Sequence, residues 1–201
     1  MTSRTELRQQ IRQQRRALSA TQRQHHAKAM ANQLVHSHIF RSARNIACYL
    51  ANDGEMDLQP VIRRLEAMNK QCYLPLLSEG KEKRMWFAPY NLGDPLKHNR
   101  YGIPEPDCSA HAWLAPQQLD LVLMPLVAFD PEGNRLGMGG GYYDRSFAFL
   151  NRLHGIKKPR LVGVAYQLQR CQALPYEPWD VPMSGIVTEC GVQHFNGKDR
   201  A

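Results

Sequence analysis

The chain has 201 residues, which suits one α/β domain, and its 43% hydrophobic and 22% charged content is ordinary for a soluble globular protein. No apolar run reaches the roughly 18 residues that a membrane span needs, and the Arg- and Gln-rich start does not have the pattern of a secretory signal, so we expect no membrane partner. The five scattered cysteines include no Cys-x-x-Cys pair, which argues against a zinc or disulfide framework and favours a reducing cytoplasm.

The formal net charge is +8, and much of it lies at the start of the chain, where residues 1–28 hold seven Lys or Arg and one Glu. Such a basic arm can bind nucleic acid or a small polyanionic ligand. No aromatic residue lies among these arginines to stack on a base. We therefore expect a small ligand and no nucleic-acid partner.

Residues 4–18 predict an amphipathic helix, because their apolar residues recur at helical spacing. The apolar stripe consists of Leu7, Ile11 and Leu18. Four arginines flank this stripe: Arg4, Arg8, Arg12 and Arg15. They form either a solvated basic face or a set from which Arg4 and Arg8 lean into a cleft and pair with phosphate. Ser19 and Gln22 then form a capping box, which predicts a second helix to about residue 35.

A strand–helix–strand unit follows. Residues 45–50 and 72–77 are apolar enough for strands, and a helix capped by Asp57, with Pro60 in its first turn, should run between them to about residue 69. This βαβ pattern implies a parallel sheet with a right-handed crossover. Loops that leave the carboxyl ends of such strands form the ligand crevice, and Glu55 lies on one of them. Glu55 either contacts a ligand or is solvated surface.

The second half of the chain predicts further strands. Residues 84–88 form a candidate strand, and residues 119–127 are almost continuously apolar, as in a strand that is buried on both faces. The Pro-rich segment 89–118 reads as a long excursion with little secondary structure, which suits a substrate wall. Two later strands are expected at 160–165 and 185–188. We expect the tail from Gly191 to fray.

The most distinctive segment is residues 135–145, Arg-Leu-Gly-Met-Gly-Gly-Gly-Tyr-Tyr-Asp-Arg, which precede a helix predicted over 142–153. A glycine-rich turn between a strand and a helix N-terminus presents backbone N–H groups to an anion. Arg135 and Arg145 could hold phosphate oxygens, and Asp144 could hold Mg²⁺. The segment has neither the dinucleotide fingerprint nor a Walker A pattern. The alternative is a flexible β–α connection without a ligand.

These parts favour phosphoryl transfer. The eight histidines lie in no nucleophile-elbow or zinc-protease motif. A glycine loop, arginines and the two carboxylates Asp144 and Asp180 fit a reaction in which the protein positions groups and neutralises charge. Mg²⁺ needs only one or two carboxylates beside phosphate oxygens, so this pair would suffice.

Several short segments occur together in the chain. The most specific are residues 128–130, Ala-Phe-Asp, and residues 139–145, Gly-Gly-Gly-Tyr-Tyr-Asp-Arg. The others are residues 7–8, 18–19, 49–50, 55, 102–106, 120–122, 125, 133–137, 175–177, 180 and 188–189. In this combination the sequence resembles the 5-formyltetrahydrofolate cyclo-ligase family over nearly its whole length.

The resemblance implies a three-layer α/β/α, Rossmann-like and mostly parallel sheet, similar to sugar-isomerase and coenzyme A transferase folds, in one domain over residues 1–201. It implies a cytoplasmic ligase, which we expect to be a monomer. This enzyme would convert 5-formyltetrahydrofolate into 5,10-methenyltetrahydrofolate with ATP and Mg²⁺, releasing ADP and phosphate. The formyl oxygen would attack the γ-phosphate, and N10 would then close the ring.

The resemblance also assigns residues by motif match. The ATP-binding residues would be Arg4, Arg8, Arg135, Leu136, Gly137, Met138, Gly139, Gly140, Gly141, Tyr142 and Tyr143. The folate-facing residues would be Leu50, Glu55, Tyr101, Met138, Gly139, Gly140, Gly141 and Tyr142. Arg135, Tyr143 and Asp144 would act in catalysis. Asp144 and Asp180 would hold Mg²⁺.

The chain departs from the family pattern at a few positions. Met138 and Gly140 stand where many members have Lys or Arg, Ser184 where aspartate is common, and Trp179 where histidine is frequent. Positive charge near the loop must then come from Arg135, Arg145 and the first helix.

Two alternative functions make different predictions. A sugar-phosphate isomerase or a coenzyme A transferase on a similar sheet would need no ATP. A nucleic-acid-binding protein would lose affinity steeply with salt.

Overall fold

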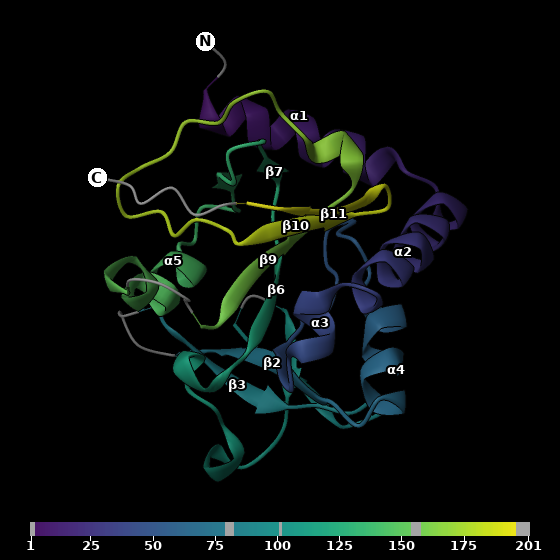
Figure 1. Ribbon diagram of the computed structural model, residues 1–201, viewed down its shortest axis with the longest axis vertical. Helices are drawn as coiled ribbons and strands as arrows, with labels where there is room; N and C mark the ends of the chain where they lie inside the picture. Colours follow the sequence, from purple (N-terminus) through teal and green to yellow (C-terminus); the bar gives the residue numbers. More distant parts are fainter. Residues whose placement is uncertain (1–2, 79–82, 101, 154–157, 196–201) are drawn as a thin grey trace.

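The computed structural model describes residues 3–78, 83–100, 102–153 and 158–195. Its centre is a seven-stranded sheet with the order β11-β10-β9-β6-β1-β2-β3 (Figure 1). The strands are β1 (Asn45–Ala47), β2 (Gln71–Leu77), β3 (Met85–Pro89), β6 (Leu121–Pro125), β9 (Arg160–Val164), β10 (Gly185–Thr188) and β11 (Gly191–His194). The five inner strands are parallel, and the edge strands β3 and β11 are antiparallel. The predicted mostly parallel α/β sheet is confirmed.

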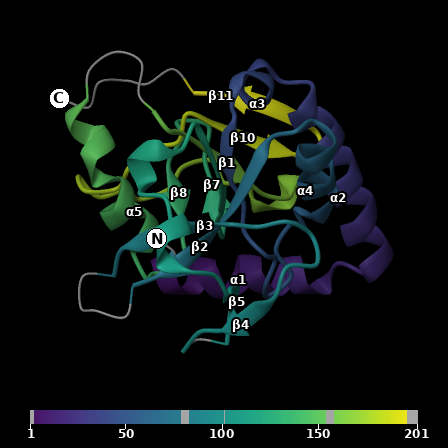
Figure 2. The same ribbon diagram turned by 90° about the horizontal axis from the view of Figure 1, so that it is seen from below.

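Helices cover both faces of this sheet, as the two perpendicular views agree (Figures 1 and 2). On one face lie α2 (Ala20–Val35), α3 (His38–Ser42) and α4 (Gln59–Ala67). On the other lie α5 (Tyr142–Phe147) and the 3₁₀ turn η3 (Ala148–Arg152). A hydrophobic core lies on each face of the sheet, and alternate side chains of β6 point into one or the other. Leu121 and Leu123 pack with the α2–α4 layer, whereas Val122 and Met124 pack with Phe147. This alternation explains why the strand is apolar throughout.

The strand order reverses beside β1. From β1 the chain moves outward through β2 and β3 in one direction and through β6, β9 and β10 in the other. The carboxyl ends of β1 and β6 therefore border the crevice in which open α/β sheets bind ligands. Helix α1 (Arg4–Ala17) lies across this end of the molecule (Figure 1), with Ile11 packed in a small core of its own that includes Leu136.

A hairpin that was not expected from the sequence follows β6. It consists of β7 (Ala128–Phe129) and β8 (Arg135–Leu136), and Asp130 forms its turn. The buried Asp130 carboxylate accepts hydrogen bonds from the backbone N–H groups of Glu132 and Asn134, both at 3.0 Å. The hairpin turns the chain back over the crevice before the glycine segment begins.

Several predicted elements differ in extent. The Ser19–Gln22 capping box of α2 is confirmed. Helix α4 begins at Gln59, so Asp57 is not its N-cap, although Asp57 Oδ1 accepts the Gln59 N–H at 2.9 Å. The Pro-rich excursion holds short pieces, which are β4 (Leu96–His98), β5 (Pro104–Pro106), η1 (Ala110–Ala112) and η2 (Pro116–Gln118). A further 3₁₀ turn is η4 (Gln167–Gln169).

The expectation that the tail frays from Gly191 is wrong for the residues described. Gly191–His194 form β11, which pairs with the whole of β10. Phe195 then packs beside Gly133, where an added Cβ would lie 3.0 Å from its ring. Sequence periodicity missed this strand because an edge strand stabilised by backbone pairing needs no buried apolar face.

None of the helices in the described part of the chain combines the length and the hydrophobicity that a bilayer crossing requires.

Asp120 stabilises the end of the sheet at which the parallel strands begin, opposite the crevice. Its Oδ2 accepts the N–H groups of Arg44 at 2.9 Å and Asn45 at 3.0 Å, and Lys158 lies 3.4 Å from Oδ1. Burial would raise the pKa of Asp120, but these backbone N–H groups and Lys158 lower it below its ordinary value. The ionised carboxylate therefore stabilises the fold.

We expect Asp120→Ala to lower the free energy of unfolding by about 1–3 kcal/mol at neutral pH, because two backbone donors lose their acceptor. Since the folded-state pKa is depressed, the ionic part of this contribution is present above the ordinary aspartate pKa and is lost as pH falls through the folded value. Denaturant unfolding of both proteins at neutral and acid pH measures the difference. Equal stability at neutral pH would contradict the assignment.

Candidate functional site

One large cavity lies at the crevice, with a volume of about 1060 Å³. Its walls come from α1, from the segment that follows β1, from the facing ends of β2 and β3, from residues 137–141 and from residues 177–180. This volume is at the upper end of the roughly 300–1,000 Å³ that small-molecule sites span. The cavity can therefore hold two ligands side by side.

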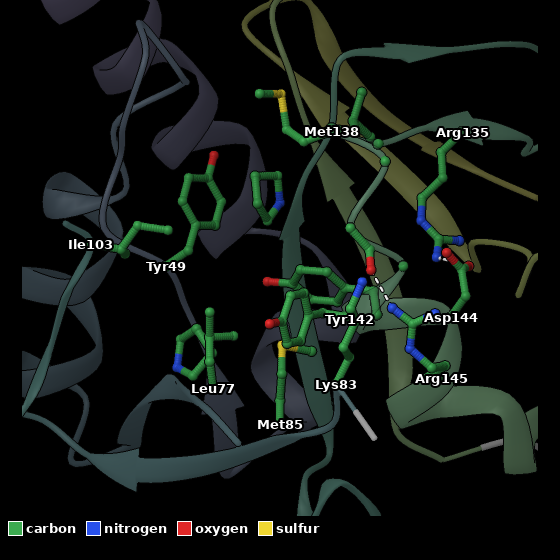
Figure 3. A pocket seen from close by; sticks show the side chains of 18 of the residues that line it. Tyr49, Leu77, Lys83, Met85, Ile103, Arg135, Met138, Tyr142, Asp144 and Arg145 are labelled. Carbon is green, nitrogen blue, oxygen red and sulfur yellow. Dashed lines mark hydrogen bonds and ion pairs between the residues drawn. The ribbon is translucent and has the colours of Figure 1, made fainter. Parts of the chain in front are cut away.

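We call residues 137–141 the glycine ribbon. It runs from β8 to α5, and Gly139 and Gly141 have φ angles of +94° and +66°, which side chains other than glycine rarely adopt. A Cβ at Gly141 would also lie 2.9 Å from the Arg145 guanidinium, which donates to the Gly140 carbonyl (Figure 3). The backbone conformation at these two positions therefore favours glycine.

The helix behind the ribbon is shorter than the sequence predicted. Helix α5 ends at Phe147 and continues as the 3₁₀ turn η3 to Arg152, in place of one helix over 142–153. A six-residue helix has a small dipole, so the cations around the ribbon must supply most of its attraction for an anion.

Two of these cations come from α1. Arg8 Nε donates to the Gly137 carbonyl at 2.8 Å, and its guanidinium lies beside Gly139. Arg4 lies 3.6 Å from an Asp180 oxygen and 3.7 Å from a Glu177 oxygen. Burial, and then the charge of Arg4, lower the pKa of Arg8. Both side chains line the cavity, which supports the cleft interpretation of this helix over a solvated basic face.

The two predicted metal ligands both line the cavity, and Asp144 bonds the residue that follows Asp180. Asp144 Oδ1 is paired with Arg135 and accepts the Val181 N–H at 3.2 Å (Figure 3). Arg135 also donates to the Val181 carbonyl, and Asp180 Oδ2 accepts the Glu177 N–H at 2.9 Å. These bonds leave one oxygen of each carboxylate for another ligand.

The described residues contain no group of three or more His, Cys, Asp or Glu side chains that could enclose a metal by themselves. Two carboxylates fit Mg²⁺ when phosphate oxygens and water complete its shell.

The opposite side of the cavity is more apolar. Figure 3 shows Tyr49, Leu77 and Ile103 facing the space from one side, across from Arg135 and Asp144. The apolar walls suit a flat organic ring, and the charged walls suit phosphate.

Glu55 is one of the carboxylates on this side of the cavity, where Glu105 Oε1 also accepts the Leu77 N–H at 3.0 Å. Glu55 Oε2 accepts the Asn52 N–H at 3.1 Å. Burial raises the pKa of Glu55 above its ordinary value, although that N–H and the charge of Arg15 act in the other direction. Burial, and then the charge of Glu55, raise the pKa of the Tyr143 phenol, which therefore stays protonated as a donor.

The structure brings together nearly all of the site residues predicted from the sequence. Those that line the cavity are Arg4, Arg8, Leu50, Glu55, Arg135, Gly137, Met138, Gly139, Gly140, Gly141, Tyr142, Tyr143, Asp144 and Asp180. Leu136 does not: its side chain is fully buried with Ile11 and Val127, because β8 turns it away from the crevice. Tyr101 lies outside the described residues.

Sequence reasoning missed other residues of the lining. The main ones are Asn52, Asp53, Leu77, Lys83, Met85, Asn99, Ile103, Glu105, Glu177 and Trp179. Lys83 lies on the β2–β3 connection, and Asn99, Ile103 and Glu105 lie on the Pro-rich excursion. The path of both segments over the crevice is set by long-range packing. The only available signal was the general rule that long ordered excursions form substrate walls.

Comparisons with known proteins agree with this geometry. A family model described as the 5-formyltetrahydrofolate cyclo-ligase family matches residues 1–189. A 5-formyltetrahydrofolate cyclo-ligase of Haemophilus influenzae is 40% identical over 185 residues, which cover 92% of this chain and 96% of the relative. One from Escherichia coli K12 is 39% identical over 178 residues, covering 89% and 96%.

Among solved structures, the NMR structure of Aquifex aeolicus 5,10-methenyltetrahydrofolate synthetase has a TM-score of 0.80 and 32% identity, covering 97% of this chain and 94% of that chain. The family model spans nearly the whole sequence. The glycine ribbon and the arginines that flank it line one cavity at the end of the sheet. The chain therefore belongs to the 5-formyltetrahydrofolate cyclo-ligase family.

Proposed function

We propose that this protein converts 5-formyltetrahydrofolate into 5,10-methenyltetrahydrofolate and uses ATP and Mg²⁺ to do so. The observation that carries the proposal is a single cavity with two unlike halves. One half holds the glycine ribbon, arginines and two carboxylates, and the other holds apolar side chains and Glu55. A nucleotide triphosphate and a reduced pterin would meet at the ribbon.

The phosphate half would hold the triphosphate tail of ATP. Arg4 and Arg8 approach the ribbon from α1, and Arg145 approaches it from α5. Charge-assisted hydrogen bonds from guanidinium groups to phosphate are among the stronger ones in proteins. These arginines would place the γ-phosphate over residues 137–141 and neutralise the charge that develops during transfer.

The pair Asp144 and Asp180 would hold Mg²⁺ together with phosphate oxygens. When bound, the ion would neutralise phosphate charge during transfer. Arg135 bonds both Asp144 and the Val181 carbonyl, so it ties Asp144 to the segment that carries Asp180. We therefore assign Arg135 the task of orienting Asp144.

The apolar half would hold the pterin, with Leu50, Met138 and Tyr142 against its faces and Glu55 accepting its N–H groups. In this pose the formyl oxygen faces the γ-phosphate. It attacks the phosphorus, ADP leaves, and N10 adds to the activated formyl carbon as phosphate departs. Tyr143, which burial keeps protonated, would donate to an oxygen of the transferred group.

The direct test is the appearance of methenyltetrahydrofolate absorbance from 5-formyltetrahydrofolate, with and without ATP and Mg²⁺, together with ADP release. We expect product and ADP in equal amounts only when both are present. A sugar-phosphate isomerase or a coenzyme A transferase would need no ATP, so turnover without ATP, or no turnover of this folate, would overturn the proposal.

We expect Arg8→Ala to raise the KM for ATP by about 10- to 100-fold, because it removes a charged hydrogen-bond donor from the phosphate half. The KM for the folate should change by less than about threefold. Steady-state kinetics with each substrate varied in turn measures the split. Arg41→Ala, an exposed arginine outside the cavity, is the control. Equal rises in both KM values would assign Arg8 a structural role instead.

Asp144→Asn should lower turnover by about 100-fold or more, because the amide keeps the shape of the side chain but removes its charge from the Mg²⁺ position. The Mg²⁺ concentration at half-maximal rate should rise as well. A titration with Mg²⁺ at saturating ATP measures both quantities. Normal turnover over the whole range of Mg²⁺ would remove Asp144 from the metal site. Asp107→Asn, at an exposed ion pair, serves as the control.

Glu55→Gln should weaken folate binding and yet stabilise the fold. Because the folded-state pKa of Glu55 is raised, the wild type loses stability as pH rises from the ordinary value of about 4.3 through the folded value, and the amide does not. The gain of the variant should therefore be absent at low pH and largest at neutral pH. Thermal unfolding across this range measures it. A variant less stable than wild type at neutral pH would contradict the argument.

A further inference from the structure

Three arginines of α1 converge on one carboxylate. Arg12 Nε lies 2.7 Å and Arg15 Nη2 3.0 Å from Asp53 Oδ2, and Arg16 pairs with Asp53 Oδ1. The Arg15 side chain is 1% exposed, and it also donates to the Asp53 carbonyl at 2.8 Å. We call these four residues the arginine clamp.

The clamp determines how the segment after β1 lies on α1. Asp53 and Gly54 have φ angles of +52° and +73°, and a Cβ on Gly54 would lie 3.5 Å from the Arg15 carbonyl oxygen. The segment therefore rests directly on the helix backbone. Aspartate is one of the residues that tolerate this left-handed region, and its three cationic partners hold Asp53 in place there.

The same short turn fixes Glu55. The Glu55 N–H donates to the Asn52 carbonyl at 3.0 Å, and the Asn52 N–H donates back to Glu55 Oε2 at 3.1 Å. Asn52 Oδ1 also accepts the Asp53 N–H at 2.8 Å. The orientation of the Glu55 carboxylate thus depends on the turn that the arginine clamp anchors.

The other half of α1 reaches the phosphate side of the cavity. Arg8 bonds the Gly137 carbonyl, and Arg4 lies beside Asp180 and Glu177. Arg4, Arg8 and Arg12 follow one another at a spacing of four residues, so they share one side of the helix. A single helix therefore links the cationic half of the cavity to the turn that carries Glu55.

We propose that Asp53 is a positioning residue that couples nucleotide binding to folate binding through α1. The inference rests on the proposed function. An anion held by Arg4 and Arg8 fixes the amino-terminal half of the helix, the arginine clamp passes that constraint to residues 52–55, and Glu55 is thereby held in place for the folate. By thermodynamic reciprocity, bound folate strengthens nucleotide binding by the same factor.

The test is the Kd of 5-formyltetrahydrofolate, measured by calorimetry with and without saturating Mg²⁺ and a non-hydrolysable ATP analogue. In the wild type we expect the analogue to tighten folate binding by about tenfold, a usual size for coupling between sites. In Asp53→Ala the analogue should change the folate Kd by less than about twofold. Full coupling in a folded Asp53→Ala variant would overturn the proposal.

Asp53 also lines the cavity, so a direct contact with ligand must be separated from coupling through the helix. Arg12 and Arg16 belong to the clamp but are not part of the cavity lining. The double variant R12Q/R16Q should lower the coupling factor to less than half of its wild-type value. An unchanged factor would show that the clamp does not transmit it, and this variant decides the matter if Asp53→Ala does not fold.

Asp120→Ala is the matched control for a loss of stability alone. Asp120 also binds backbone N–H groups and a cation, but at the opposite end of the sheet. The Asp120→Ala variant should keep the full coupling factor. If this variant also lost the coupling, Asp53 would have only a general stabilising role. If the wild type binds neither the analogue nor the folate, the proposed function itself fails. If it binds both independently, only the coupling is wrong.

Discussion

The site depends on how the positive charge of α1 is balanced at the carboxyl end of the sheet. Arg12, Arg15 and Arg16 share Asp53, so one carboxylate serves three guanidinium groups. Arg8, in the described part of the chain, is bonded to a neutral carbonyl, and burial and Arg4 lower its pKa. Of the two α1 arginines that line the crevice, Arg4 lies beside Asp180 and Glu177, whereas Arg8 is bonded to the Gly137 carbonyl. An anionic ligand would be a favourable partner for the charge of Arg8.

The glycine ribbon is where backbone conformation and charge meet. The positive φ angles of Gly139 and Gly141 disfavour larger residues, which explains the glycines at these two positions. Because α5 is short, cations from α1 and α5 replace much of what a long helix dipole would supply. Arginines from other elements thus supply the positive charge around Met138 and Gly140.

Glu55 shows that the site is not arranged for stability. A carboxylate whose pKa is raised by burial favours its neutral form, and the fold would gain from its removal. Unfavourable features of this kind collect at functional sites, where positioning matters more than the local free energy.

The sequence alone determined the local elements and the fold class. Helical spacing placed Arg4 and Arg8 on one flank of an amphipathic helix, and the strand–helix–strand pattern required a parallel sheet. These inferences succeed because period and capping are properties of neighbouring residues. The phosphate site marked by the glycine segment and Asp144 stays a prediction.

The tertiary structure decided what meets across the crevice. It placed Asp53 among three arginines and buried the Leu136 side chain in the small core beneath α1. It also bonded Asp144 to Val181 and paired β11 with β10. All of these contacts except the β10–β11 pairing link residues far apart in the chain, and their formation depends on the order of the strands and on the packing of α1. No local pattern encodes that order, because each contact is set by the free energy of the whole fold.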